Sequence, residues 1–381
     1  MTMKNFLVSQ LKNIYSAYVN KLSRKSHSKE LKQQVVYLLS FPNNNHGLIE
    51  ELNEKYPVVV CYTKNMASEA LVLKELGIEI HLIDSFSGLR ETVQAVSESQ
   101  VVLADNYFAF LGDIEKQESQ SFFQIWHATG AIKQFGLEDV KSKARSKSDQ
   151  ERFKRVYNSF DYFVVGSKKM GEVFIRSYGV KESNICYTGF PRTDYLLKEV
   201  KEKNTESTQT KILYLPTYRQ EKNQHLTDDM VKLVESLDDT YYLKIKTHPH
   251  EEITQEELIK TSSQIELVKS DESADKLLLE ADILITDYSS VAFDYSLINP
   301  AGKLIFYWYD EARYIKETGL QPNIKESLPS QVCHSIEEVV AEIKSQQQDL
   351  SHFNKIWNTY NDGQATKRLL EKIAEKMDGN T

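Results

Sequence analysis

The sequence predicts an α/β protein with two domains, each built on a mostly parallel β-sheet that helices cover on both faces. Its 381 residues are enough for two domains of ordinary size. Short apolar runs alternate with helix-like segments along the chain, a rhythm typical of parallel sheets. This rhythm stops once, at the polar residues 198–210, and then starts again, which predicts a linker between two similar halves.

Composition supports a packed core, because 40% of the residues are hydrophobic and 27% are charged. The three cysteines (Cys61, Cys186 and Cys333) are far apart and have no zinc-like spacing, so a reducing compartment is expected. No apolar run reaches the roughly 18 residues that a transmembrane helix needs. The N-terminus also lacks the pattern of a secretory signal, so we expect a cytoplasmic protein.

Residues 1–34 predict a basic amphipathic helix. They carry a net charge of +6, whereas the whole chain carries −8 and the remainder therefore −14. Leu7, Leu11, Ile14 and Tyr18 recur at helical spacing. Such a helix suits a membrane interface with anionic headgroups, but a surface helix packed on the domain fits equally well. The acidic remainder disfavours nucleic-acid binding.

Residues 35–197 are predicted to form the first domain. Six apolar runs read as its strands: Val35–Leu39, Val58–Tyr62, Ile78–Ile83, Val101–Ala104, Phe122–Trp126 and Tyr162–Val165. Met66–Leu76 and Leu89–Ser97 read as helices between them. A basic run between Lys141 and Arg155 is typical of a solvated helix face, although it could also help to hold a diphosphate or a lipid surface.

Residues 211–349 are predicted to form the second domain. Its expected strands are Ile212–Leu215, Tyr242–Ile245, Ile265–Val268, Ile283–Thr286 and Leu304–Tyr307. Ser335 and Glu338 have the spacing of a capping box that opens a helix over Ile336–Ile343. Residues 350–381 are predicted to be helical, with a final helix over Arg368–Met377.

Four polar clusters follow predicted strands, at the sheet edge where open α/β sheets bind ligands. In the first cluster, His127 can act as a general base near neutral pH, and Lys133 can place a positive charge near a phosphate. A structural histidine that caps a turn is the alternative for His127. The second cluster presents Thr217 and Arg219, and an arginine can fork two phosphate oxygens. A surface turn with one arginine fits the second cluster equally well.

The third cluster presents Lys246 and His248, and Pro249 restricts His248 to an extended backbone. A metal pair of His248 and His250 is disfavoured, because no cysteine or acidic triad lies nearby in sequence.

In the fourth cluster a buried strand runs into Asp287, and Ser289 and Ser290 follow at the start of a helix. The free amides of that helix start favour an anion, and the two hydroxyls add donors. Simple N-capping by either serine uses the same geometry, so both interpretations stay open. The sequence has no GxxxxGK[ST], GxGxxG or GxSxG motif, which excludes a P-loop, the usual dinucleotide fingerprint and a nucleophile elbow.

Together these motifs resemble the CDP-glycerol glycerophosphotransferase family, whose members build wall teichoic acid in Gram-positive bacteria. The resemblance rests on Trp126–Lys133 with Phe135-Gly136, Tyr187–Asp194, Leu215–Arg219, Lys246–Pro249 and Asp282–Ser290. The short chain and the run Asp105–Phe108 are most similar to the TagB/TarB glycerol-phosphate primase branch. One departure is Thr318, which precedes Gly319-Leu320 where many relatives have a basic residue.

The resemblance implies a GT-B architecture, with two Rossmann-like domains facing a central cleft. It implies transfer of sn-glycerol-3-phosphate from CDP-glycerol to an undecaprenyl-diphosphate-linked GlcNAc–ManNAc acceptor, with release of CMP. The enzyme would work as a peripheral protein at the cytoplasmic face of the cell membrane, with no cofactor and no tightly bound metal.

In this interpretation His127 takes the proton of the acceptor hydroxyl, and His248 assists the donor diphosphate. The residues expected to contact substrate or to orient those that do are Lys133, Thr217, Arg219, Lys246, Asp287, Ser289 and Ser290.

Three other functions stay open on the sequence alone. A polyglycerol- or ribitol-phosphate polymerase, or a capsule-linked relative, would share the same motifs. A GT-B glycosyltransferase that uses a nucleotide-sugar would share the fold. A scaffold that only binds lipid or nucleotide would tolerate the loss of both His127 and His248.

Overall fold

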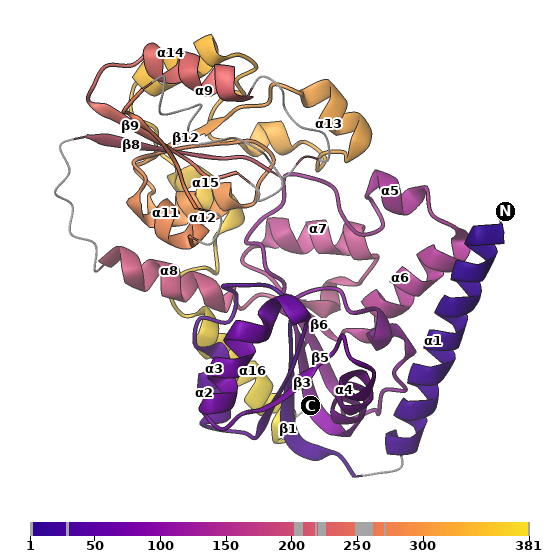
Figure 1. The fold of residues 1–381 in the computed structure, drawn as a ribbon. Coiled ribbons are helices and arrows are strands. Elements are labelled where there is room, and N and C mark those ends of the chain that lie inside the picture. Colours follow the sequence, from indigo (N-terminus) through magenta and orange to yellow (C-terminus); the bar gives the residue numbers. More distant parts are fainter. Residues whose placement is uncertain are drawn as a thin grey trace.

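The computed structural model describes residues 3–27, 30–201, 209–217, 219, 226–247, 262–269 and 272–379. These residues form two α/β domains (Figure 1). The predicted linker 198–210 lies mostly outside the described residues; 198–201 belong to helix α8, and Thr210 begins strand β8.

The N-terminal domain contains a parallel sheet with the strand order β3-β2-β1-β4-β5-β6-β7. Its strands are β1 (Lys32–Leu39), β2 (Val58–Tyr62), β3 (Glu79–Leu82), β4 (Ser99–Ala104), β5 (Ser121–Gln124), β6 (Tyr162–Val164) and β7 (Ile185–Cys186). The six predicted strands are confirmed, and β7 is an addition. β1 and β4 lie at the centre, and their paired residues from Val35–Val101 to Leu38–Ala104 are fully buried. Burial on both faces explains why these strands are continuously apolar.

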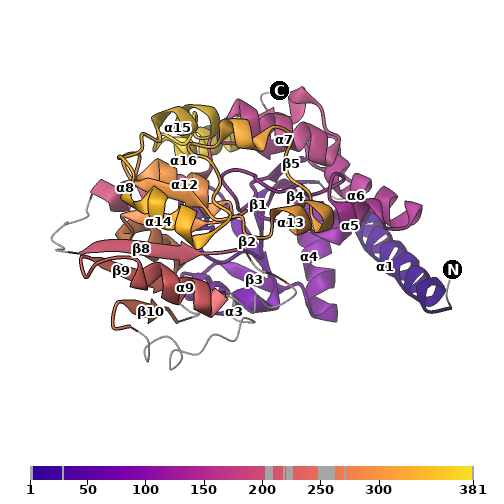
Figure 2. The same ribbon diagram turned by 90° about the horizontal axis from the view of Figure 1, so that it is seen from above.

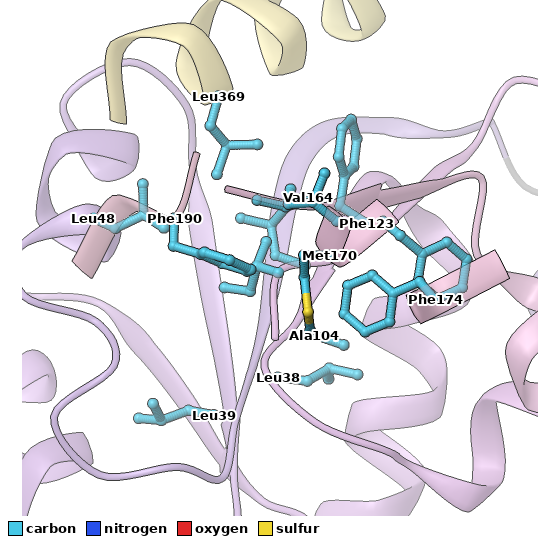
Figure 3. Close-up of a cluster of buried hydrophobic side chains, with 14 of the residues drawn as sticks. Leu38, Leu39, Leu48, Ala104, Phe123, Val164, Met170, Phe174, Phe190 and Leu369 are labelled. Carbon is cyan, nitrogen blue, oxygen red and sulfur yellow. The ribbon is translucent and has the colours of Figure 1, made fainter. Parts of the chain in front are cut away.

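Helices cover this sheet on both faces. The helices of this domain are α1 (Met3–His27), α2 (Leu48–Asn53), α3 (Ala67–Glu75), α4 (Phe86–Glu98), α5 (Val140–Lys143), α6 (Lys147–Ser159), α7 (Lys168–Tyr178) and α8 (Pro191–Lys201), with short 3-10 turns η1 (Lys64–Met66), η2 (Ala109–Asp113) and η3 (Glu182–Asn184). Figure 3 shows Met170 and Phe174 of α7 packing beside Phe123 and Val164 of the sheet. This apolar contact fixes the strand ends that carry the site.

The C-terminal domain contains a second parallel sheet, with the order β10-β9-β8-β11-β12. Its strands are β8 (Thr210–Leu215), β9 (Tyr241–Ile245), β10 (Ile265–Leu267), β11 (Ile283–Thr286) and β12 (Lys303–Phe306). The described helices are α9 (Leu226–Glu235), α11 (Ala274–Glu280), α12 (Val291–Ile298), α13 (Glu311–Glu317), α14 (Ile336–Lys344) and α15 (Ser351–Trp357), with the 3-10 turn η4 (Ile324–Ser327). The predicted start of α14 is confirmed, because the Ser335 hydroxyl accepts the Glu338 N–H.

Each sheet has a topological switch point. There the connections that leave two neighbouring strands run toward opposite edges of the sheet. The switch point lies between β1 and β4 in the first sheet and between β8 and β11 in the second. Loops diverge at such a point and leave a crevice beyond the strand ends. Three predicted clusters follow β5, β8 and β11, at or next to these points.

The last helix, α16 (Ala365–Met377), returns to the N-terminal domain and packs against α8 and β4 (Figure 1). The Asp194 carboxylate accepts the N–H groups of Ala365 and Thr366 and so caps the start of α16. The Gln100 amide donates to the carbonyls of Lys376 and Met377 at its end. α16 therefore connects the end of the chain to the first sheet.

Helix α1 lies along the outer side of the N-terminal domain (Figure 2). Val19, Ser23 and Ser26 are buried, and α1 packs against α4 and η2. Leu7 and Ile14 remain exposed on another face of α1. The helix therefore packs on the domain and leaves an apolar stripe uncovered, and its contact with a membrane stays a prediction. Among the described residues, no helix has the length and apolar character that a bilayer span requires.

Candidate active site

A cleft of about 840 Å³ lies between the two domains, and loops beyond the strand ends of both sheets line it. Five of the predicted site residues line this cleft: His127, Lys133, Lys246, Ser289 and Ser290. The first two come from the N-terminal domain and the other three from the C-terminal domain. The structure thus brings together residues that lie up to 163 positions apart in the sequence.

The His127 ring is held in one tautomer. Its Nδ1 lies 2.9 Å from the backbone oxygen of Asp105. Because a carbonyl oxygen only accepts, Nδ1 carries the hydrogen, and Nε2 keeps its lone pair. The ring stacks on Phe41, with 3.9 Å between ring centroids, and packs at a tilt against Trp126, with 4.3 Å. His127 is therefore oriented with its basic nitrogen turned away from Asp105.

Burial lowers the pKa of His127 to about 4, and the positive charges of Lys133 and Arg192 act in the same direction. The hydrogen bond to the Asp105 carbonyl opposes this shift. The imidazole is neutral at physiological pH as a result, which is the form that can accept a proton.

Asp105, directly after β4, organises the surroundings of His127. Its carboxylate accepts the backbone N–H groups of Ser40 and Phe41 and the Ser40 hydroxyl, each at 2.8 Å. Burial raises the pKa of Asp105 to about 6, and these hydrogen bonds oppose the shift. Its carbonyl holds the His127 ring while its carboxylate holds the loop that carries Phe41 against that ring. Sequence analysis assigned Asp105 no role at the site, because its partners follow a different strand.

Trp126 turns the chain sharply between β5 and His127. Its φ of 56° lies in the left-handed region, where a bulky residue is strained by roughly 1–2 kcal/mol. The Trp126 carbonyl accepts from the Asn44 amide at 2.7 Å, and its N–H donates to the Gln124 side chain at 2.9 Å. These bonds hold the turn that presents His127.

The segment after His127 contacts the C-terminal domain through its backbone. At Gly130 a Cβ atom would lie 2.5 Å from the Phe293 ring of α12, so only glycine fits this approach. An antiparallel β-bridge joins Lys133 to Leu320, and Gln321 N–H donates to Ile132 O at 2.8 Å. The segment that follows the unusual Thr318 therefore holds Lys133 in place by its main chain.

Ser289 and Ser290 stand at the N-terminus of α12 on the other side of the cleft. The Ser290 side chain makes no capping hydrogen bond, and Ser289 Oγ lies 3.4 Å from the Val291 nitrogen. The Ser290 hydroxyl is thus not used as a cap, and the helix start can offer donors to an anion.

Lys246 lines the cleft just after β9, and its Nζ donates to the Lys269 carbonyl at 3.3 Å. His248, its predicted partner, lies outside the described residues. Its assignment stays a prediction from sequence.

Arg219 is not among the residues that line the cleft. The sequence interpretation had expected it to be a direct phosphate ligand. Its guanidinium pairs with Asp287 at 2.8 Å and with Asp310 at 2.9 Å. Burial would lower the pKa of Arg219, but the two carboxylates outweigh it and raise the pKa above its ordinary value. The rings of Tyr288 and Tyr314 also lie within about 5 Å of the guanidinium carbon. Arg219 therefore stabilises the turn that carries the serines.

Thr217 and Asp287 belong to the same support. The Thr217 N–H donates to the buried Asp287 carboxylate at 2.8 Å, and the Tyr288 N–H donates to it at 2.6 Å. Thr217 Oγ1 is buried and has no hydrogen-bond partner within the described part of the chain. Neither residue lines the cleft. The geometry favours an orienting role for Asp287, which connects the loops after β8 and β11.

A buried ion network that the sequence did not reveal joins the two domains at the cleft. Arg192, at the start of α8, donates to Asp294 at 2.8 Å and to Asp275 at 2.9 Å. Thr129 also donates to Asp294, and His46 Nε2 lies 3.1 Å from Asp275. Arg192 stands in the Tyr187–Asp194 motif, but its carboxylate partners lie about 80 to 100 positions later, so no local pattern could pair them.

Comparisons with known proteins agree with this architecture. The family model of CDP-glycerol:poly(glycerophosphate) glycerophosphotransferase matches residues 21–375. The teichoic acid glycerol-phosphate primase of Bacillus subtilis strain 168 is 33% identical over 384 residues, which cover 96% of this chain and 98% of that protein. The primase of Staphylococcus aureus strain NCTC 8325 is 30% identical over 378 residues, with 96% and 98% covered.

A structure of the wall teichoic acid polymerase TagF with CDPG superposes with a TM-score of 0.71 at 20% identity, covering 100% of this chain and 99% of that one. This likeness confirms the predicted GT-B fold of two α/β domains. Because the family model spans nearly the whole chain, the chain belongs to the CDP-glycerol:poly(glycerophosphate) glycerophosphotransferase family of enzymes.

Proposed function

We propose that this protein transfers sn-glycerol-3-phosphate from CDP-glycerol to a hydroxyl of a lipid-linked acceptor and releases CMP. The observation that carries the proposal is the neutral, oriented His127 in a cleft whose opposite wall holds Ser289, Ser290 and Lys246. Family membership supports CDP-glycerol as the donor. The names of the relatives in Bacillus subtilis and Staphylococcus aureus support a priming reaction.

In the proposed reaction the acceptor oxygen attacks the phosphorus that carries glycerol. A new phosphorus–oxygen bond forms, and the bond from that phosphorus to the bridging oxygen of the diphosphate breaks, so that CMP leaves. His127 Nε2 takes the proton of the attacking hydroxyl. The protein otherwise positions the reactants and stabilises charge, as is usual in phosphoryl transfer.

The donor diphosphate is proposed to lie at the N-terminus of α12. Ser289, Ser290 and the helix amides would donate hydrogen bonds to its oxygens, and Lys133 and Lys246 would offset its charge. Arg219, Thr217 and Asp287 would act through the turn that they hold. His248 is retained as a second proposed catalytic group, on sequence alone.

The acceptor is proposed to be undecaprenyl-diphosphate-linked GlcNAc–ManNAc at the cytoplasmic face of the cell membrane. The relatives are named teichoic acid glycerol-phosphate primases, which supports a priming step. The acceptor itself is what the motif resemblance implies. The exposed stripe of α1, with Leu7 and Ile14, supports attachment to a lipid surface. We expect a peripheral enzyme that reaches its acceptor from the membrane surface.

The deciding experiment is mass spectrometry of the product made from CDP-glycerol and a synthetic lipid-linked disaccharide. Addition of glycerol phosphate with equimolar CMP supports the proposal. CDP-ribitol, UDP-sugars and a primed acceptor are offered in parallel. Long polymers from the primed acceptor, or transfer from either of the other donors in place of CDP-glycerol, would refute a glycerol-phosphate primase.

A further inference from the structure

A second cavity of about 540 Å³ lies outside the active-site cleft, in a groove between α1 and α6. Its walls combine apolar rings with charged groups. Leu11, Tyr107 and Phe153 supply apolar surface, and lysine, arginine and aspartate side chains supply the charges.

The groove carries an excess of positive charge. Its four cations face two acids, Asp113 and Asp149. Asp149 pairs with Lys12 at 2.6 Å and with Arg152 at 2.8 Å, and Asp113 pairs with Arg155 at 3.2 Å. The fourth cation is Arg145, for which the described part of the chain offers no ion pair.

Arg145 stands just before α6, with its guanidinium carbon 5.7 Å from the centre of the Phe153 ring. It is exposed at the groove, so its charge is available to a ligand. An arginine beside an aromatic wall suits a ligand that has a phosphate and an apolar part.

The groove adjoins the active-site cleft. Tyr107 lines the groove, and the preceding residue, Asn106, lines the cleft. Ring contacts continue from Tyr107 to Tyr157 at 6.0 Å, from Tyr157 to Tyr178 at 4.2 Å and from Tyr178 to Trp126 at 6.0 Å. A continuous path of ring contacts therefore connects the groove to Trp126, the residue before His127.

The outer wall of the groove continues into the apolar stripe of α1. Leu11 lines the groove and is 66% exposed, with Leu7 (56%) and Ile14 (64%) on either side of it in the helix. A hydrocarbon chain that leaves the groove would meet this apolar surface without crossing charged residues of the same stripe.

We propose that this groove binds the diphosphate and the first hydrocarbon units of the lipid-linked acceptor. Arg145 would contact the diphosphate, the rings of Tyr107 and Phe153 would face the hydrocarbon, and the attached sugars would extend past Asn106 to His127. The inference rests on the proposed function for the identity of the acceptor. It adds a binding site that lies outside the catalytic cleft.

The test compares Arg145→Glu with Lys147→Glu, which removes another exposed cation, two residues further along the chain, that does not line the groove. Initial rates are measured with saturating CDP-glycerol and a short-chain lipid-diphosphate disaccharide in detergent, without vesicles. We expect KM for the acceptor to rise about tenfold or more in Arg145→Glu, because a charge-assisted bond is replaced by repulsion. KM for CDP-glycerol should stay unchanged in Arg145→Glu. In the control Lys147→Glu, KM for both substrates should stay unchanged.

Direct binding separates this inference from the proposed function. Calorimetric titration with farnesyl diphosphate, in the absence of any donor, should show weaker binding to Arg145→Glu than to Lys147→Glu. If the two variants bind equally, the groove inference is overturned, whether or not the wild type turns over CDP-glycerol. It is also overturned if Arg145→Glu loses only binding to phosphatidylglycerol vesicles, because the groove would then recognise lipid headgroups.

Discussion

Three contacts fix the His127 imidazole before substrate arrives. The Asp105 carbonyl sets its tautomer, Phe41 stacks on the ring, and Trp126 packs against it at a tilt. The backbone of Trp126 has a strained left-handed conformation, which places the His127 ring at this position. Because the imidazole is already oriented, the site has to rearrange less during the reaction.

Replacing His127 by alanine should lower kcat about 10²- to 10⁴-fold, the usual contribution of a general base. Binding of CDP-glycerol and the melting temperature should change little, because the ring makes one hydrogen bond to the described part of the chain. His352→Ala, on the exposed surface of α15, serves as the control. Near-normal turnover by purified His127→Ala would remove the proposed base.

The lowered pKa of His127 predicts the pH profile. The neutral imidazole is the active form, and a lowered pKa extends that form to more acidic pH. We expect kcat/KM to stay level from pH 8 down to the region of pH 5 and to fall as pH approaches the pKa of about 4. An acidic limb centred near 6.5 instead would show that His127 is solvated in the working enzyme.

Asp105 should act as a positioning residue. In Asp105→Ala the Ser40 and Phe41 amides lose their acceptor and Phe41 no longer holds the His127 ring, so kcat should fall about 10- to 100-fold. KM for CDP-glycerol should change little, because the donor contacts lie on the other domain.

Asp105→Asn keeps an oxygen for the two amides and should recover most of the rate. If both variants lose stability in parallel with rate, so that kcat per folded molecule is constant, Asp105 is purely structural.

At the scale of elements, helix α1 has two different surfaces. One face packs on α4 and η2 through Val19 and Ser23, and the Ser23 hydroxyl accepts from Ser97 and from the Glu115 N–H. The other face leaves Leu7, Leu11 and Ile14 in solvent. The packed face fixes the direction in which the exposed face points.

Replacing Leu7 and Ile14 together by glutamate should weaken binding to phosphatidylglycerol vesicles by more than about tenfold, since two buried aliphatic side chains would be lost from the lipid interface. Neither residue lines the groove, so turnover of a detergent-soluble acceptor should persist. The matched control carries glutamate at Leu71 and Val72, which are similarly exposed on α3. Equal vesicle binding by the two double variants would reject α1 as the membrane contact.

Strands were the elements that sequence reasoning located best. β2 coincides with the predicted Val58–Tyr62, because a strand buried on both faces must be continuously apolar. β7 escaped prediction because Ile185–Cys186 is too short to show a period. The exposure of one α1 face could not be predicted either, since an apolar stripe in the sequence does not reveal which part of the molecule, if any, covers it.

The site was predictable in parts and not as a whole. Strand ends identify His127, Lys133, Lys246, Ser289 and Ser290, which the fold brings to one cleft. The position of Arg219 depends on Asp310, 91 residues later, and local patterns carry no information on such a pairing. Asp105 escaped notice for a similar reason, because its role follows from the order of the strands.

At the scale of the whole molecule, specific contacts join the two halves of the chain. The bridge between Lys133 and Leu320 ties the catalytic loop to the C-terminal domain. Helix α16 returns to the first sheet and is capped there by Asp194. The network of Arg192 with Asp275 and Asp294 forms part of the cleft wall.

Arg192→Ala is expected to destabilise the protein by about 3–5 kcal/mol, because it leaves Asp275 and Asp294 buried without their cation. The midpoint of urea unfolding measures this loss. The control Arg313→Ala removes an exposed pair with Glu317 and should cost less than about 1 kcal/mol. Because Thr129 shares Asp294 with Arg192 and stands two residues after His127, kcat should fall as well. A variant as stable and active as the control would mean that the two domains hold the cleft together without this ion network.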